Sequence, residues 1–406
     1  MSKQLEILSI ASSGKGTGVV KEIQDGKELS VPYFVPCTVP GDIIEIKNEK
    51  KSKKYVEAEV DKVIIKSKYR VDGLCPNFTI CGGCNILNVD YGEQRRQKLN
   101  IVAQILKRNN ITHPPIKLIG CEKYFNYRYK AKVFVAVKDG VLFCGFMKRQ
   151  SKEVIKVSEC KIVHEKIVDF MKKFNDKKIS GKYEETISVV VDFVTNNIAT
   201  FCDTKNKDTI QFLKDNSSFF NQEINFSYLS NEIPFNYNEK TFIQSNLLQN
   251  SKLVDAVISN VDKREVLFDL YSGIGNFAIL LSKDSKKILS VEGDLNSFSM
   301  QLANCVKNKI TNVRCVHDEV FHFLKHTDAK PSTIILDPPR TGCDEKIIEK
   351  IVKLSPKKII YVSCDPVSLK DNLKLLLKEY KILKMYVVDM FPNTEHIETV
   401  SVLERK

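Results

Sequence analysis

From about residue 240 onward, near-continuous apolar runs alternate with segments of helical pattern. The runs are VLFDLYSG, KKILSVEGD, STIILDPPR, KKIIYVSCDP, KMYVVDMF and IETVSVLER. Strands that are apolar on both faces and separated by helices are typical of a parallel sheet covered by helices on both sides. The pattern therefore predicts a doubly wound α/β domain over residues 237–406.

The first part of the chain has a different pattern, in which short apolar runs alternate with turn signals. Asp25-Gly26 lies between two alternating strands, and the lysine run at 50–54 is typical of a hairpin tip. Several short strands at this spacing predict a small OB-like β-barrel over residues 1–64.

Between these two parts, residues 65–236 mix cysteines, basic residues and strands, which predicts a central α+β domain. Its segment YRYKAKVFVAVKDGVLFCGFM indicates a hairpin whose first strand carries Arg128, Lys130 and Lys132 at alternate positions. Three cations on one face suit a surface that follows a phosphate backbone. Tyr127, Tyr129 and Phe134, in the same segment, can either stack bases or fill the core, and we expect the core.

The charge distribution supports a polyanionic partner. The net charge is +13, and residues 51–150 hold 20 Lys and Arg against 8 Asp and Glu. The last 156 residues hold 24 against 21 and are nearly balanced. A basic segment beside a nearly neutral one indicates that the basic part binds a polyanion. A solvated lysine-rich surface explains the composition equally well.

A glycine-rich turn follows the first predicted strand of the α/β domain. Asp269 opens the segment DLYSGIGNFA, and Glu292 ends the next strand 23 residues later, where a carboxylate can accept both ribose hydroxyls. These residues alone fit a dinucleotide site almost as well, or a purely structural turn. The loops after the later strands favour chemistry on a flat base over hydride transfer with a dinucleotide. Asp-Pro-Pro-Arg at 337–340 and Ser-Cys-Asp-Pro at 363–366 each follow a strand. Prolines fix such loops for contact with a flat base.

Four motifs in the order DLYSGIGNF, LDPPRTGC, VSCDP and HIETVSVLER resemble those of the RNA uracil-5-methyltransferase family. The resemblance covers essentially the whole chain. It implies a class I methyltransferase fold for residues 237–406 and an N-terminal TRAM domain in the predicted barrel. The implied reaction is methyl transfer from S-adenosylmethionine to carbon 5 of a uridine in 23S rRNA or in tRNA.

The resemblance also implies the residues that contact S-adenosylmethionine. FIQSN at 242–246 is similar to the family's FFQVN segment, whose Gln contacts this cofactor. The positions carried over are Gln244, Tyr271, Asn276, Glu292, Asp318 and Asp337.

Two further residues carry the expected chemistry. Uridine carbon 5 becomes nucleophilic when a thiolate adds to carbon 6, and a base must later remove the carbon 5 proton. We expect Cys364 to be the nucleophile and Glu398, in the family's HxETV pattern, to be the base. Cys343 is a competing thiol, ranked behind because it lies beyond a glycine on a loop. Asp365 stands where the family most often has Asn, and a carboxylate there can either raise the pKa of the thiol or contact the base differently.

Twelve cysteines in a chain expected in the reducing cytoplasm indicate metal ligation or catalysis rather than disulfides. Cys75, Cys81 and Cys84 form C-x5-C-G-G-C, and Cys160 follows 76 residues later. This spacing fits neither a zinc ribbon nor the radical S-adenosylmethionine motif. The resemblance implies that these four hold a [4Fe-4S] cluster, which we expect to order the RNA-binding domain. The same cysteines favour 23S rRNA over tRNA.

No run approaches the roughly 18 apolar residues of a membrane span, and the N-terminus lacks a signal-peptide pattern. We expect a cytoplasmic monomer that binds RNA and no membrane. Two alternatives remain: methylation of another target such as cytosine carbon 5, and an RNA-binding module with an inactive catalytic domain. Intact Asp337, Cys364 and Glu398 argue against the second.

Overall fold

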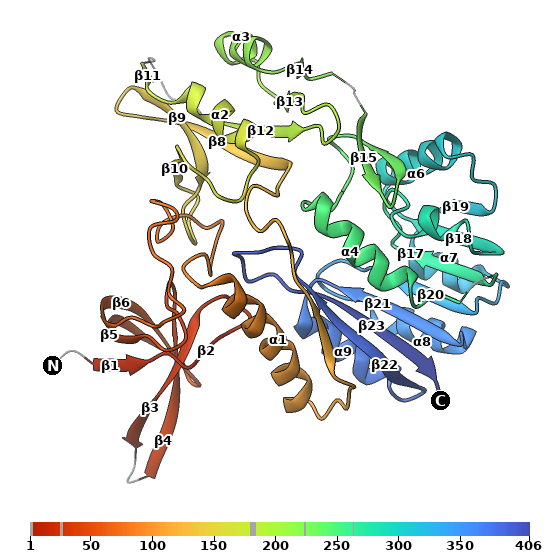
Figure 1. Cartoon of the computed structure of the whole chain (residues 1–406), viewed down its shortest axis with the longest axis horizontal. Helices are drawn as coiled ribbons and strands as arrows, with labels where there is room; N and C mark the ends of the chain where they lie inside the picture. The colour runs from red at the N-terminus through yellow and green to blue at the C-terminus, as the bar shows by residue number, and fades with distance from the viewer. Residues whose placement is uncertain (1–2, 25–26, 179–183, 223–224, 263) are drawn as a thin grey trace.

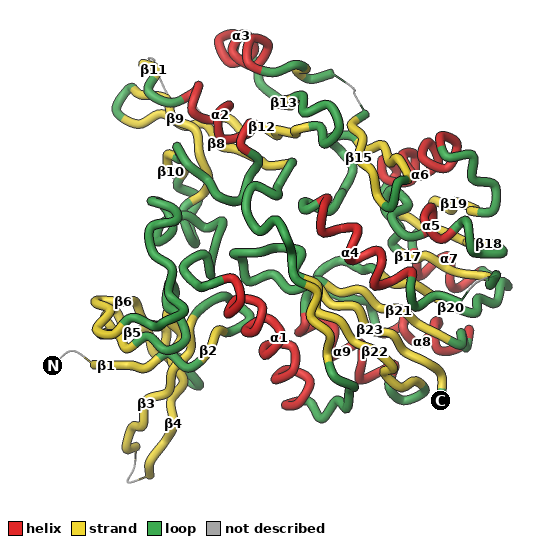
Figure 2. Tube along the Cα trace, viewed as in Figure 1, coloured by secondary structure: helices red, strands yellow, loops and turns green. Residues whose placement is uncertain are grey.

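The computed structural model describes residues 3–24, 27–178, 184–222, 225–262 and 264–406 of the 406-residue chain (Figure 1). Its strands form three large sheets and one hairpin, and helices gather mainly around the C-terminal sheet (Figure 2). No helix among these residues is long and apolar enough to cross a membrane.

The N-terminal sheet has six strands in the order β1-β5-β6-β4-β3-β2. They are β1 (Lys3–Glu6), β2 (Ser9–Ile10), β3 (Gly16–Gln24), β4 (Lys27–Val35), β5 (Ile43–Lys51) and β6 (Val56–Ile65). The predicted hairpin tip in the lysine run is confirmed, because Lys51 pairs with Val56. The turn predicted at Asp25-Gly26 lies outside the described residues.

The strands of the predicted barrel form a sheet, but closure of the barrel is not confirmed, because β1 and β2 are the two edges of the sheet and do not pair with each other. These edge strands are nevertheless consecutive in the chain and separated by two residues. The amide of Ile7 donates to the carbonyl of Asp42, and that of Leu8 to the carbonyl of Thr17. The segment from β1 to β2 therefore bonds to both ends of the sheet.

The central sheet follows the path β10-β9-β8-β12-β13-β14, with β11 beside β9. Its strands are β8 (Lys130–Lys138), β9 (Val141–Met147), β10 (Val154–Lys156), β11 (Lys177–Lys178), β12 (Glu184–Val191), β13 (Ile198–Phe201) and β14 (Phe219–Phe220). The hairpin predicted around Asp139-Gly140 is confirmed by the pairing of β8 with β9. Helices α2 (Glu165–Phe174) and α3 (Lys207–Asn216) and the hairpin of β15 (Phe226–Ser230) and β16 (Ile233–Tyr237) complete this part.

The C-terminal sheet has eight strands in the order β19-β18-β17-β20-β21-β23-β22-β7. They are β7 (Ile116–Ile119), β17 (Val266–Leu270), β18 (Lys287–Glu292), β19 (Val313–His317), β20 (Thr333–Leu336), β21 (Lys358–Ser363), β22 (Tyr380–Val388) and β23 (Glu398–Arg405). Strands β17 to β21 are parallel to their neighbours, whereas β23 runs antiparallel between β21 and β22. The predicted apolar runs thus became the strands of a doubly wound sheet.

Helices cover both faces of this sheet. They are α1 (Tyr91–Arg108), α4 (Leu247–Ile258), α5 (Ala278–Leu281), α6 (Leu295–Lys307), α7 (Val320–His326), α8 (Glu345–Leu354) and α9 (Pro366–Leu376). Alternate strand residues divide between two cores: Leu267, Ile288 and Ile335 pack with α4, α5 and α6. Phe268, Leu289 and Ile334 pack with α1, α7, α8 and α9. The period of two is the pleat of each strand, buried on both sides.

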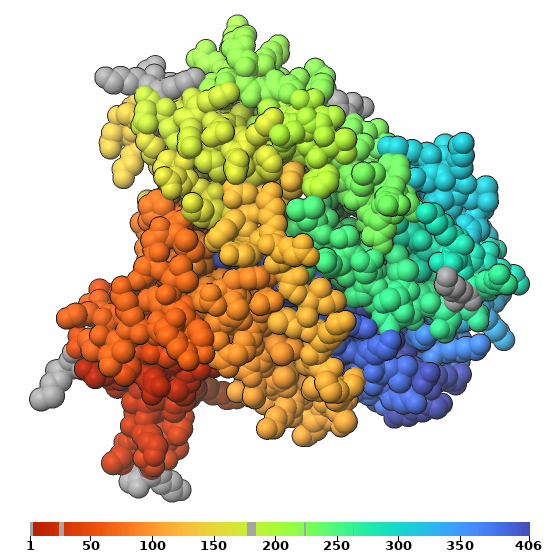
Figure 3. Space-filling view, in the orientation of Figure 1, coloured from red at the N-terminus to blue at the C-terminus, as the bar shows by residue number. Residues whose placement is uncertain are grey.

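The predicted partition at residue 236 differs from the structure in one segment. Residues 91–119, expected in the central domain, supply helix α1 and strand β7, and β7 pairs in parallel with β22 as the last strand of the C-terminal sheet. Figure 3 shows this orange segment filling the space between the N-terminal sheet and the blue C-terminal strands. A four-residue apolar run does not reveal from sequence which sheet it joins.

One face of α1 is polar and yet buried. Lys98 Nζ lies 2.7 Å from Asp389 Oδ1, and the two side chains are 1% and 0% exposed. Lys98 also donates to the carbonyl of Phe391 at 2.8 Å. Gln94 accepts from the amide of Asn393 at 2.8 Å and donates to its side-chain oxygen at 3.0 Å. Helix α1 therefore holds the loop between β22 and β23.

Removing one member of the buried pair leaves the other charge without compensation. We predict that Lys98→Met lowers the free energy of unfolding by about 3–5 kcal/mol, measured by urea denaturation. The exposed Lys107→Met on the same helix should change it by less than about 0.5 kcal/mol. The double variant Lys98→Met/Asp389→Leu should recover much of the loss. An unfolding free energy unchanged in Lys98→Met would show that the pair does not hold the loop.

Candidate active site and cysteine pocket

The expected catalytic pair lies at one edge of the C-terminal sheet. In the antiparallel pairing of β21 with β23, Ser363 lies opposite Thr399. The next position in that register places Cys364, one residue beyond β21, beside Glu398, the first residue of β23. The hydroxyl of Thr399 donates to the carbonyl of Ser363 at 3.1 Å and fixes this register. The structure thus brings the two predicted residues together.

Burial and neighbouring charges set the protonation of this pair. Glu398 is 2% exposed and its Oε1 has no hydrogen-bond partner within the described residues. Burial, with a further contribution from Asp337, raises the pKa of Glu398 well above its usual range, while Arg340 opposes the shift. Burial, then Glu398 and Asp337, raises the pKa of Cys364 to about 11. Both shifts favour the neutral thiol and the neutral carboxylic acid.

Asp365 has a structural role at its position. Its carboxylate caps helix α9 by accepting from the amides of Val367 at 3.1 Å and Ser368 at 3.4 Å. The charges that act most on the Cys364 thiol are those of Glu398, Asp337 and Arg340.

Cys343 is a core residue. Its side chain is 6% exposed and packs in the core beneath α8 and α9. Its amide donates to Asn372 Oδ1 at 2.9 Å, and its carbonyl accepts from Asn372 Nδ2 at 2.8 Å. Burial raises the pKa of this thiol to about 11. These contacts agree with ranking Cys343 behind Cys364.

The glycine-rich turn after β17 has the geometry of a ligand cradle. Gly273 has φ of +56°, and a Cβ added there would meet no atom within 4 Å. Its amide donates to Glu292 Oε2 at 2.7 Å. Tyr271 has φ of +63°, a strained conformation for a bulky residue that is typical of functional turns. The turn leaves open space beside the carboxylate at the end of β18.

Several carboxyl groups gather at these strand ends. Burial, with nearby Asp337 and Glu292, raises the pKa of Asp269 to about 8, and its Oδ1 has no partner within the described residues. Burial raises the pKa of Asp337 to about 7. With Glu398 these groups form a cluster of buried acids. A cationic ligand such as a sulfonium would favour their ionised forms.

Two of the other expected cofactor residues, Asn276 and Asp318, form hydrogen bonds with neighbouring side chains. Asn276 and Asn250 of α4 exchange reciprocal amide hydrogen bonds of 2.8 and 3.1 Å. Both carboxylate oxygens of Asp318 lie within 2.8 Å of His322 Nδ1. Gln244 is half-buried in the loop before α4 and forms no hydrogen bond with another described residue. The structure brings Asp337, Glu292 and Tyr271 to one edge, with Asn276 in the adjoining glycine-rich turn, whereas Asp318 lies farther along, after β19.

The four expected metal-ligating cysteines line one pocket of about 70 Å³, together with Arg128 and Phe78. Burial first, and then the neighbouring thiols, raise the pKa of Cys84 well above its usual range. The amide of Gly83 points at the sulfur of Cys81 at 3.4 Å. No group of three or more His, Cys, Asp or Glu within the described ranges is close enough to hold a metal ion.

Two of the three expected phosphate-binding cations have other partners. Arg128 borders the cysteine pocket. Lys130 donates to the carbonyls of Glu239 at 2.7 Å and Thr241 at 3.1 Å. Lys132 alone of the three is exposed. The expectation of a three-cation surface is therefore wrong for Arg128 and Lys130, while the expectation of buried aromatics is met by Tyr127 and Tyr129.

Comparison with known proteins decides the family. The model of the tRNA (uracil-5-)-methyltransferase family matches residues 204–406, half of the chain. The chain belongs to this family. It is 28% identical to an uncharacterized RNA methyltransferase of Bacillus cereus, over 98% of this chain and 96% of the relative. It is 26% identical to the 23S rRNA (uracil(1939)-C(5))-methyltransferase RlmD of Legionella pneumophila, over 100% of this chain and 97% of the relative.

A solved structure supports the fold along the whole chain. The Pyrococcus abyssi tRNA (uracil-54, C5)-methyltransferase, in complex with S-adenosyl-L-homocysteine, aligns with a TM-score of 0.75. It is 19% identical, and the alignment covers 99% of this chain and 100% of that one. All three parts of the family member described here therefore share their arrangement with that enzyme.

The electrostatic link between Glu398 and Cys364 predicts a shift in thiol reactivity. In Glu398→Gln the loss of the carboxylate charge should lower the pKa of Cys364 below its wild-type value of about 11. The measurement is the pH profile of iodoacetamide alkylation, followed by mass spectrometry of the Cys364 peptide. The matched variant Glu349→Gln, exposed on α8, should leave the profile unchanged. An alkylation profile that is unchanged in Glu398→Gln would show that the charge of Glu398 does not act on the Cys364 thiol.

Proposed function

We propose that this family member transfers a methyl group from S-adenosylmethionine to carbon 5 of a uridine in RNA, with 23S rRNA favoured as the substrate. The observation that carries the proposal is the proximity of Cys364, one residue beyond β21, to Glu398, the first residue of β23, whose charge acts on the Cys364 thiol. The relative of known substrate at 26% identity is a 23S rRNA enzyme, whereas the aligned solved structure is a tRNA enzyme. We further propose that it works as a cytoplasmic monomer.

The residues proposed to hold S-adenosylmethionine are Gln244, Tyr271, Asn276, Glu292, Asp318 and Asp337. The open cradle at Gly273 and the carboxyl groups at the strand ends fit its ribose and its cationic groups. When bound, it supplies the electrophilic methyl group. Ionised Asp337 is then stabilised by the positive charge beside it, which offsets the cost of its burial.

Cys364 and Glu398 divide the chemistry on the uridine. The Cys364 thiolate adds to carbon 6, and the electron pair displaced from the double bond makes carbon 5 nucleophilic. Carbon 5 then bonds to the methyl group. Glu398 takes the carbon 5 proton, the double bond re-forms, and the Cys364 thiolate leaves. Because burial raises the pKa of Cys364, its proton must be lost to water before the thiolate adds to carbon 6, and Glu398 must be ionised when it takes the carbon 5 proton.

The N-terminal and central parts are proposed to bind the RNA. The bonding of both edges of the N-terminal sheet to the β1–β2 segment supports an OB-like TRAM domain over residues 1–64. The basic residues concentrated at 51–150 supply the attraction for phosphates. A uridine within the RNA must leave its stack to reach the strand ends, and Phe242, 71% exposed beside Gln244, can cover the opened site.

The four cysteines are proposed to hold a [4Fe-4S] cluster. Their common pocket and the Gly83 amide aimed at sulfur support it, because cluster sulfurs need hydrogen-bond donors. Arg149 steadies the cysteine loop by donating to the carbonyl of Cys84 at 2.8 Å. The amide of Ile86 donates to the carbonyl of Asn393 at 3.3 Å, so this loop contacts the loop that precedes Glu398. The cluster would order both.

The catalytic assignment predicts distinct phenotypes for two variants. With labelled S-adenosylmethionine and unmodified 23S rRNA or tRNA transcripts, digestion to nucleosides should show label in 5-methyluridine from one RNA. Cys364→Ala should reduce the rate by at least about 10⁴-fold. Glu398→Gln should reduce it by about 10²–10⁴-fold and accumulate a covalent protein–RNA complex, because the last proton is not removed.

Cys343→Ala serves as the control for the loss of a thiol and should retain methyl transfer. Label in another nucleoside would refute the uridine assignment. No label from either RNA, in protein that binds S-adenosylmethionine, would favour the binding-module alternative.

The cluster assignment predicts a loss of iron on single substitution. Protein purified without oxygen should contain iron and sulfide, and Cys160→Ser should lose both and unfold at a lower temperature, because metal binding is coupled to folding. Cys315→Ser, a half-buried thiol outside the pocket, should keep both. Iron-free wild-type protein after reconstitution would rule out the cluster. A folded Cys160→Ser that binds RNA normally but lacks methyl transfer would rule out a purely structural role.

A further inference from the structure

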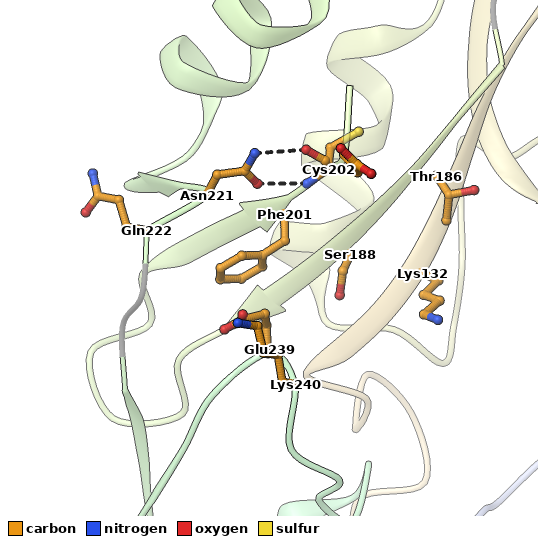
Figure 4. A pocket seen from close by; sticks show the side chains of 10 residues that line it. Lys132, Thr186, Ser188, Phe201, Cys202, Asn221, Gln222, Glu239 and Lys240 are labelled. Carbon is orange, nitrogen blue, oxygen red and sulfur yellow. Dashed lines mark hydrogen bonds between the residues drawn. The ribbon is translucent and has the colours of Figure 1, made fainter. Parts of the chain in front are cut away.

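A second cavity lies on the central sheet, apart from the strand-end site. It has a volume of about 530 Å³, which is the size of a small-ligand site. The residues of its sheet wall are Lys132, Thr186, Ser188, Phe201, Asn221 and Gln222 (Figure 4). Glu239 and Lys240, in the segment that follows β16, form the facing wall. No residue of the proposed catalytic machinery lines it.

The sheet wall is ordered across three adjacent strands. Lys132 of β8 pairs with Ser188 of β12, and Ser188 pairs with Phe201 of β13. Residues directly opposite each other share a face of the sheet, so the three side chains form a row. Two strand spacings separate the ammonium end from the ring end by about 10 Å. That span is close to the length of one nucleotide, measured from its phosphate to the far edge of its base.

This face of the sheet is open, whereas the other is covered. Helix α2 contacts β8, β9 and β12 on the covered side, where Val133, Ile187 and Val189 join the core. On the open side Lys132 and Thr186 are exposed and Ser188 and Phe201 are half-buried. The side chain of Lys132 forms no ion pair or hydrogen bond with any described residue. The row therefore offers a cation, hydroxyls and a ring to a ligand.

The far end of the row is fixed by a side-chain clamp. Asn221 accepts from the amide of Cys202 at 2.9 Å and donates to the carbonyl of Cys202 at 2.8 Å (Figure 4). The ring of Phe201 is backed by Phe226 in an edge-to-face contact at 6.4 Å. Both contacts hold the wall in place before a ligand arrives, which lowers the entropy cost of binding.

The charges around the cavity determine where the phosphate and the base of a nucleotide can bind. Lys132 offers its cation on the β8 side of the sheet, where a phosphate fits. Asp203, two residues after Phe201, and Glu239 also line the cavity. Their carboxylates repel a second phosphate and accept hydrogen bonds from amino groups. Adenine, guanine and cytosine carry such an exocyclic amino group, and uracil does not.

The cavity is linked to the proposed active site through the chain. Lys130, two residues before Lys132, donates to the carbonyls of Glu239 and Thr241. The facing wall is thereby tied to the sheet only four residues before Gln244. An RNA strand that leaves the strand-end site along this segment reaches the cavity directly.

We propose that this cavity is a subsite for one nucleotide of the RNA other than the target uridine, with its phosphate at Lys132 and an amino-bearing base stacked on Phe201. The proposal rests on RNA being the substrate. It assigns to the central sheet a recognition role separate from catalysis: a base held here fixes which neighbouring uridine is presented to Cys364.

The test is a coupling measurement on the full-length protein. Synthetic fragments of 23S rRNA and of tRNA, each with one abasic nucleotide, are titrated against wild type and Ser188→Tyr, whose ring fills the cavity. At one RNA position the abasic change should weaken wild-type binding about ten-fold, the loss expected of one stacked base, and Ser188→Tyr binding hardly at all. Uridine at that position should weaken binding less than the abasic nucleotide does, because uracil still stacks on Phe201 but lacks the amino group.

Lys132→Ala and Lys138→Ala remove the same charge from the same strand, and only Lys132 lines the cavity. Lys132→Ala should lower the salt dependence of RNA binding by about one phosphate contact and raise the KM for RNA with kcat unchanged, whereas Lys138→Ala should do neither. Equal effects of the two variants, or the absence of a coupled RNA position, would overturn the proposal. Binding needs no methyl transfer, so failure of the proposed reaction would be recognised separately.

Discussion

The buried contact between Lys98 and Asp389 is the interaction on which the site depends most. It joins helix α1 to the end of β22, and Glu398 begins β23 only nine residues later. The intervening loop is held from every side: Gln94 binds Asn393, Tyr127 donates to the carbonyl of Pro392 at 2.9 Å, and Asn246 donates to the carbonyl of Met390 at 3.2 Å. A base on such a loop is positioned by three parts of the chain at once.

The same helix links the N-terminal sheet to this loop. Gln97 accepts from the amide of Ile10 at 3.0 Å, so β2 contacts α1 just as the loop before Glu398 does. Helix α1 therefore connects the N-terminal sheet with that loop. The buried acids at the strand ends complete the arrangement, because a positively charged ligand would stabilise their ionised forms.

Local patterns were enough to predict the C-terminal domain. The six apolar runs became β17, β18 and β20 to β23, and the motifs after them placed Asp337 and Cys364 at one edge, since parallel strands end together. The partner of Cys364 was found through the HxETV pattern, and the register of β21 and β23 agrees with it. Short, near-continuous apolar strands with motifs at their ends carry this information within a few residues.

Long-range polar contacts could not be predicted in the same way. Gln94 and Lys98 are one helical turn apart and look like a solvated face, yet their partners are 299 and 291 residues away. In the sequence, Lys130 and Lys132 look like equivalent cations. In the structure, Lys130 donates to two carbonyls of the loop at 239–241, whereas Lys132 is exposed. Strand β7 is too short to reveal its sheet. Each of these contacts joins segments that are far apart in the sequence, and no local pattern shows that they meet.

The most direct test of the mechanism is to map a trapped covalent complex. Substrate RNA with 5-fluorouridine at the target carries no removable proton at carbon 5, so the enzyme should stop at the methylated adduct. We expect peptide mass spectrometry to find this nucleotide attached to Cys364. Attachment to Cys343, or methyl transfer to ordinary RNA without any trapped complex, would contradict nucleophilic catalysis by Cys364.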